Sequence, residues 1–96
     1  IPRAGKADVD LAVKAARAAF ESGVWRNKTP DEKGRVLWRI AELIEANAQE
    51  LIELETIDQG KPLYVSTAEI YGAAAQFRFF AGMTSKIEGE TMSPSI

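Results

Sequence analysis

Apolar and small residues recur every three or four positions along most of the chain, the spacing that lines up one face of an α-helix. The first such run follows Asp8, whose carboxylate is suited to an N-cap, and Gly23 is placed to stop it. The pattern therefore predicts a first helix between Asp8 and Gly23. Its apolar face comprises Val9, Ala12, Val13, Ala16, Ala19 and Phe20.

A second helix has the clearest start signal in the sequence. Thr29 supplies a hydroxyl for the N-cap, Pro30 suits the first helical position, and Glu32 completes a capping box. An apolar stripe runs along one face of this helix. The stripe comprises Val36, Leu37, Ile40, Leu43 and Ile44.

Asn47 marks an expected break, because Asn47 and Glu50 have the spacing of another capping box. A third helical segment should follow and end at Gly60, since Pro62 prevents simple continuation. Its apolar residues are Leu51, Ile52, Leu54 and Ile57.

The last helix is predicted to begin at Pro62, or at Ser66 with Glu69 as a capping box, and to run to about Gly82. It is apolar or small on several sides, so we expect it to be covered on several sides by neighbours that this chain does not supply. After Lys86 the composition predicts an extended or flexible exit. The fold class is therefore mostly α, with about four helices in a helical layer. The apolar and small positions of the last helix are Ala68, Tyr71, Gly72, Ala74, Ala75, Phe77, Phe79 and Phe80.

Charge and composition narrow the range of partners. The chain has 96 residues and a formal net charge of −2, with acids and bases interspersed. It has no clustered basic face for nucleic acid, no polybasic stretch for an anionic membrane surface, and no apolar run near the roughly 18 residues of a membrane span. We expect neither a nucleic-acid nor a membrane partner. The chain lacks an initiating Met, and we expect it to be part of a longer protein.

The sequence contains no Cys and no His. Thiolate nucleophiles, Cys/His zinc sites and Ser-His-Asp triads are therefore excluded within these 96 residues. A chain without cysteine is compatible with a reducing compartment, and we expect a cytoplasmic protein.

Four segments, in order along the chain, resemble the N-terminal part of the aldehyde dehydrogenase superfamily. The stretch 54–62, Leu-Glu-Thr-Ile-Asp-Gln-Gly-Lys-Pro, is similar to that family's E-T-x-D-N/Q-G-K-P signature. The segment 7–20 resembles the family's first helix, and Trp25 followed by Pro30, Arg35, Leu37, Ala41 and Ile44 resembles its second. The segment 77–82 with 86–91 resembles an aromatic-rich helix end and the start of the strand after it.

This resemblance implies a parent enzyme that oxidises an aldehyde to a carboxylic acid with NAD or NADP. In that family a Cys attacks the aldehyde, hydride passes to the nicotinamide, and a Glu assists hydrolysis of the thioester. The parent fold is α/β with a Rossmann-like cofactor domain, and these parts lie later in a family chain. Residues 1–96 are thus expected to be a single partial domain, the N-terminal helical part of the cofactor-binding domain, with the catalytic domain absent. No catalytic or cofactor-binding residue is assigned here, the isolated chain should be inactive, and the parent should be a homo-oligomer.

Two tentative site assignments follow from the resemblance. Asp58 matches the signature's Asp, which in several members helps to bind a structural monovalent cation, and an ordinary helix-terminal carboxylate is the alternative. Tyr71, Gly72 and Ala75 lie on the helix that lines part of the substrate entrance in the family. Lys61 follows Gly60, but the upstream glycines of a phosphate loop are absent, so we expect a solvated side chain or a partner of the helix dipole.

Other features favour ordinary structural roles. The aromatic residues are expected in the core or at an interface, and the modestly basic stretch 26–39 on a solvated face. The alternatives to an enzyme fragment are a free-standing helical interaction module and a fragment that self-associates. We expect the isolated chain to associate or to bind a hydrophobic dye. The aromatic residues expected in the core or at an interface are Trp25, Trp38, Phe77, Phe79 and Phe80.

Overall fold

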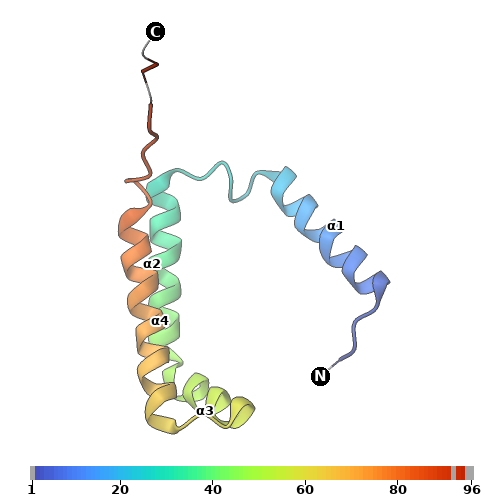
Figure 1. Cartoon of the computed structure of the whole chain (residues 1–96), viewed down its shortest axis with the longest axis vertical. Helices are drawn as coiled ribbons and strands as arrows, with labels where there is room; N and C mark the ends of the chain where they lie inside the picture. The colour runs from blue at the N-terminus through green and yellow to red at the C-terminus, as the bar shows by residue number, and fades with distance from the viewer. Residues whose placement is uncertain (1, 92, 95–96) are drawn as a thin grey trace.

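A computed structural model describes residues 2–91 and 93–94, and this part of the chain contains four α-helices and no strand. The helices are α1 (Lys6–Ser22), α2 (Pro30–Ala46), α3 (Ala48–Gln59) and α4 (Leu63–Met83). The molecule is elongated, with extents of 60 × 36 × 30 Å, and α1 stands away from the other helices (Figure 1). The predicted mostly-α fold class is confirmed.

The core lies where α4 runs back along α2, with α3 packed at the turn between them (Figure 1). Its residues are mainly small, which lets the helix backbones approach closely. Gly34 of α2 shows how closely: a Cβ added there would lie 2.9 Å from the carbonyl oxygen of Ala81 on α4. The buried side chains are Ala41, Ala48, Ile52, Ser66 and Ala74.

The predicted apolar stripe of α2 is only partly covered in the structure. Val36 and Leu43 remain 37% and 45% exposed, and Ile40 is only half-buried. The contact face is instead the row of small residues Gly34 and Ala41, which continues into α3 at Ala48. Helix α2 packs on α4 through the face with the smaller side chains, because small side chains permit a closer approach of the two backbones. Larger apolar side chains of α2 therefore remain uncovered.

Helix starts were predicted with mixed success. The capping box of α2 is confirmed, because Thr29 Oγ1 accepts from Glu32 N–H at 3.2 Å and Glu32 Oε2 accepts from Thr29 N–H at 2.7 Å. Asp8 as the N-cap of the first helix was wrong. Helix α1 starts at Lys6, and Asp8 lies in its first turn, where Oδ2 accepts from Gly5 N–H at 2.8 Å.

The chain breaks between α2 and α3 as predicted, but Asn47 does not cap α3 through its side chain. Its Nδ2 donates to the carbonyl oxygen of Leu43 at 2.8 Å, and therefore serves the end of α2. Of the two starts predicted for the last helix, Pro62 is confirmed as N-cap and Ser66 was wrong. Gly60 ends α3 with a φ of 69°, a left-handed conformation that favours glycine.

Besides part of the apolar stripe of α2, two further surfaces remain uncovered among the described residues. Every residue of α1 is exposed, and α1 packs against none of the other three helices. Helix α4 was predicted to need neighbours beyond this chain, and it carries exposed large side chains on several sides. No helix in the described part is long and apolar enough to cross a membrane. The exposed side chains of α4 are Leu63, Tyr64, Tyr71, Phe79, Phe80 and Met83.

Candidate functional site

The corner between α3 and α4 is held by an ion-pair cluster around Lys61. Its Nζ lies 2.5 Å from Glu55 Oε1 on α3 and 2.5 Å from Glu69 Oε2 on α4, and the Lys61 side chain is 20% exposed. The expectation of a solvated Lys61 was therefore wrong, and the alternative of a partner of the helix dipole stays a prediction. Hydrogen bonds from Lys61 to Glu55 and then to Glu69 raise the pKa of Lys61 above its ordinary value of 10.5.

A buried hydroxyl pair joins the same two helices. Thr56 Oγ1 donates to Ser66 Oγ at 2.8 Å, and Ser66 is fully buried. Ser66 therefore has a hydrogen-bond partner in the core, as a buried hydroxyl requires. Together with the Lys61 cluster, this bond fixes the direction in which α4 leaves α3.

Asp58 lies in the last turn of α3, close to this corner, and is exposed. One exposed carboxylate beside the carbonyl groups of a helix end could supply one or two oxygen ligands to a hard cation. The described residues contain no group of three or more acidic side chains that could complete such a site. The tentative assignment of Asp58 to a cation site stays a prediction that requires ligands from other segments.

The three residues assigned to the substrate entrance share an exposed face of α4. Tyr71 is 51% exposed, and Gly72 and Ala75 are exposed beside it at helical spacing. A Cβ added at Gly72 would meet no heavy atom within 4 Å, so this face is open. The structure thus brings these three residues together, while Asp58 lies on a different helix. Their role at a substrate entrance stays a prediction.

A second contact between distant segments was missed by the sequence analysis. Arg78 of α4 donates to Glu45 of α2 through both terminal guanidinium nitrogens, from Nη1 to Oε1 at 2.5 Å and from Nη2 to Oε2 at 2.6 Å. The Cζ atom of Arg78 lies 5.4 Å from the ring centroid of Trp38. The hydrogen bond from Arg78 lowers the pKa of Glu45 below its ordinary value of 4.5 and raises that of Arg78. The partners are 33 residues apart, so no local sequence signal could have paired them.

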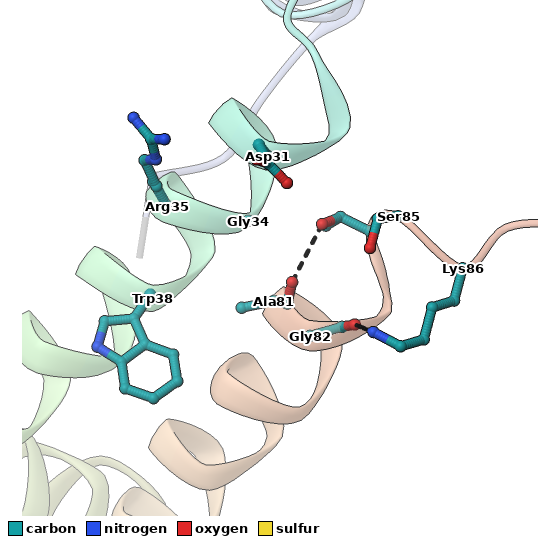
Figure 2. Close-up of a pocket in the computed structure, with 9 residues that line it drawn as sticks. Asp31, Gly34, Arg35, Trp38, Ala81, Gly82, Ser85 and Lys86 are labelled. Atoms are coloured by element: carbon teal, nitrogen blue, oxygen red, sulfur yellow. Dashed lines mark hydrogen bonds between the residues drawn. The ribbon is translucent and has the colours of Figure 1, made fainter.

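An open groove of about 410 Å³ lies between the start of α2 and the end of α4 (Figure 2). Its polar groups do not converge on one point. In Figure 2, Arg35 points away from Lys86, while the Lys86 ammonium donates to the carbonyl oxygen of Gly82 and Thr84 Oγ1 donates to Ala81 at 3.0 Å. The lining residues are Asp31, Gly34, Arg35, Trp38, Ala81, Gly82, Thr84, Ser85 and Lys86. Because the side-chain donors of Thr84 and Lys86 bind backbone carbonyl oxygens, we interpret this groove as a by-product of the packing of α2 on α4.

The aromatic and basic residues show mixed outcomes. Trp25, Trp38, Phe79 and Phe80 are between 47% and 61% exposed, so the core described here does not contain them. The basic residues are largely at the surface, as predicted, and some lie over aromatic rings. Arg26 Cζ lies 4.8 Å from the ring centroid of Phe20, and Lys33 Nζ lies 5.9 Å from that of Trp25.

The described residues therefore form a helical unit that is held by polar contacts between α3 and α4 and between α2 and α4, with exposed apolar faces. Residues 1–95 match the family model described as the aldehyde dehydrogenase family. The chain belongs to the aldehyde dehydrogenase family. The resemblance predicted from four short segments is confirmed.

Curated relatives agree with this assignment. The chain is 42% identical over 92 residues to an aldehyde dehydrogenase of Aspergillus niger and 45% identical over 89 residues to aldehyde dehydrogenase 1 of Tanacetum cinerariifolium. It is 49% identical over 86 residues to aldehyde dehydrogenase family 2 member B4, mitochondrial, of Arabidopsis thaliana. These matches cover 96%, 92% and 88% of this chain but only 18%, 18% and 16% of the relatives. The chain thus spans less than a fifth of the length of these proteins.

Proposed function

We propose that this chain is the N-terminal helical part of the cofactor-binding domain of an aldehyde dehydrogenase. The whole protein would oxidise an aldehyde to a carboxylic acid with NAD or NADP. The observation that carries this proposal is the family match over residues 1–95, set against the small share of each relative that the match covers.

The chemistry of the parent is assigned to other segments. The chain has no Cys, so the thiolate that attacks the aldehyde must come from elsewhere in the parent. Residues 2–91 and 93–94 form helices without a strand, so they offer no sheet edge for a dinucleotide. These residues by themselves do not fit the cofactor. We therefore propose that the 96-residue chain alone has no dehydrogenase activity.

This chain is proposed to contribute part of the substrate entrance and one ligand of a cation site to the parent enzyme. The open face of Tyr71, Gly72 and Ala75 is proposed to line part of the substrate entrance, and the Lys61 cluster sets the direction of that helix relative to α3. Asp58 is proposed to supply one ligand to a structural monovalent cation, with other ligands from later segments. The remaining partners proposed are the rest of the parent chain and further copies of the parent, in the cytoplasm.

The test compares this chain with the protein encoded by its full reading frame. The full protein should reduce NAD or NADP in the presence of an aldehyde, and the 96-residue chain should match a boiled control. Turnover by the 96-residue chain would contradict the assignment of the chemistry to other segments. A reading frame that ends shortly after residue 96, without a downstream Cys, would contradict the proposed parent and favour a helical interaction module.

A substitution in the full protein tests the substrate entrance. Gly72→Trp places a large side chain on the open face of α4, where an added Cβ would meet no heavy atom within 4 Å. We expect a higher KM for bulky aldehydes with a smaller change for acetaldehyde. Gly82→Trp is the matched control, since Gly82 is also open and helical but lies near the other end of α4. Equal effects of both substitutions would contradict the assignment.

A further inference from the structure

The face of α2 turned away from α4 carries an apolar hollow that no described residue fills. The hollow has a volume of about 370 Å³ and lies between α2 and α3. Val36 continues the same row toward the start of α2 and is 37% exposed. We call this surface the α2/α3 hollow. Its lining residues are Ile40, Leu43, Ile44, Asn47, Glu50, Leu51 and Leu54.

Helix α1 carries an apolar face of matching kind that also lacks a partner. Val9, Val13 and Phe20 are 56%, 63% and 52% exposed, and Ala16 lies in the same row. In proteins most of the stability of a helix comes from tertiary packing of its apolar face, and α1 packs against none of the other described helices. An apolar face of this kind favours burial, because removal of apolar surface from water is favourable.

The register of the two helices matches if α1 folds back antiparallel to α2. Val9 and Leu43 lie at equal sequence distances from the connected ends of their helices. Val9 is counted back from Ser22 at the end of α1, and Leu43 is counted forward from Pro30 at the start of α2. The same equality holds for Ala16 and Val36, and it holds within one residue for Val13 and Ile40. Both helices rise by about 1.5 Å per residue, so these pairs would lie opposite one another.

The segment 23–29 between the helices is suited to this closure. Connections of roughly two to eight residues join neighbouring antiparallel helices in bundles. Gly23 has a φ of 72°, so the chain turns sharply at the end of α1. In Figure 1, α1 extends from the start of α2 on the side toward which α3 projects, so a swing about segment 23–29 brings α1 toward α3.

Charge at the closed end would also be complementary. Arg3 and Lys6 lie at the N-terminal end of α1, and Glu50, which lines the hollow, lies in the first turn of α3. In the antiparallel register these two ends meet. Lys6 is paired only with Asp10 of its own helix and its side chain is 91% exposed, so little is lost when it changes partner.

We propose that in solution α1 folds back on this chain and fills the α2/α3 hollow with Val9, Val13 and Ala16. This closure concerns the 96-residue chain and does not depend on the proposed enzymatic function. It leaves the exposed aromatic side chains of α4 uncovered.

Hydrogen exchange of the α1 amides tests the closure. We expect protection in α1 of about tenfold or more over an unstructured peptide, independent of protein concentration. Val13→Asp and Leu43→Asp should each abolish this protection. Leu11→Asp is the matched control, because Leu11 is 67% exposed and lies on the opposite side of α1, and it should leave the protection unchanged. Unprotected α1 amides in the unsubstituted chain would overturn the proposal.

A cross-link gives a second test that does not rely on destabilising charges. The chain has no Cys, so a double variant carrying Val13→Cys and Ile40→Cys introduces only the two thiols of interest. We expect an intramolecular disulfide in the monomer, and none for the control pair Leu11→Cys with Ile40→Cys. Equal disulfide formation in both pairs, or disulfides found only between two chains, would overturn closure within one chain and favour exchange of α1 between copies.

Discussion

Arg78 and Glu45 form a bidentate ion pair that ties α4 to α2, with nitrogen–oxygen distances of 2.5 Å and 2.6 Å. The guanidinium also lies over Trp38, 5.4 Å from its ring centroid. Arg78 thus contacts two residues of α2 at once. Its planar group suits both contacts, because it can pair with both carboxylate oxygens and stack on an aromatic face.

Replacing Arg78 with Lys should lower the midpoint of thermal unfolding. An ammonium group keeps the charge but cannot reproduce the two parallel hydrogen bonds to Glu45 or the stacking on Trp38. Circular dichroism at 222 nm would measure the transition. Arg17→Lys is the control, since Arg17 pairs with Glu21 at 3.4 Å within α1 and its side chain is 71% exposed. Equal shifts for both variants would show that the bidentate geometry contributes nothing.

Stability should fall on the acid side of the ordinary Glu pKa of 4.5. Arg78 lowers the folded-state pKa of Glu45, and a backbone hydrogen bond from Thr29 lowers that of Glu32. A lowered folded pKa contributes stability that is present above the unfolded value and is lost as pH falls through the folded value. Urea unfolding between pH 7 and pH 3 should show this loss, and Glu45→Gln should make it shallower. An unchanged slope in that variant would contradict the assignment.

The alkaline side should behave in the opposite sense at Lys61. Its folded-state pKa is raised above 10.5 by Glu55 and Glu69. That contribution is fully present below the unfolded pKa and is lost only as pH rises through the raised folded value. Unfolding midpoints measured between pH 7 and pH 10 should therefore show no loss from this cluster. Lys61→Met should lower stability throughout that range, and an unaffected variant would show that the corner is held by the buried Thr56–Ser66 bond.

Removing the cap of α2 should destabilise the helix pair. Thr29→Ala deletes the oxygen that accepts from Glu32 N–H at 3.2 Å, and loss of such a cap costs about 0.5–2 kcal/mol. Denaturant unfolding would measure the difference. Thr29→Asp should restore most of the stability, because a carboxylate accepts the same bond and favours the positive end of the helix. If Ala and Asp behaved alike, the capping box would not be stabilising.

Two glycines should respond to the same substitution with opposite signs. Gly34→Ala places a Cβ 2.9 Å from the Ala81 carbonyl oxygen and 3.0 Å from Thr84 Oγ1, and overpacking of this kind costs about 1–3 kcal/mol. Gly72→Ala meets no heavy atom within 4 Å and replaces a poor helix former, a gain of about 0.5–1 kcal/mol. Urea unfolding of the two variants side by side checks both signs. The same sign for both would contradict the close approach at Gly34.

Local signals in the sequence predicted the helices and most of their ends. Thr29 with Glu32, Gly23 and Gly60 act through hydrogen bonds and backbone conformations within a few residues, so the chain near them suffices to predict their roles. The Asn47 capping assignment failed because its side chain binds the Leu43 carbonyl one turn earlier, at the end of α2. The Ser66 assignment failed because tertiary packing pairs its hydroxyl with Thr56 of α3. The family was also predictable, since four short segments carry the resemblance and the family match extends over residues 1–95.

The sequence by itself therefore determined the helical class, the breaks at Gly23, Asn47 and Gly60, and membership of the aldehyde dehydrogenase family. Only the tertiary structure decided that α2 meets α4 through Gly34 and Ala41, and that Arg78 and Lys61 bind carboxylates on other helices. The physical reason is the range of the interactions. Caps and stops depend on neighbours within one helical turn, whereas the choice of a packing face depends on how closely two backbones can approach, which is settled only when both helices are in place.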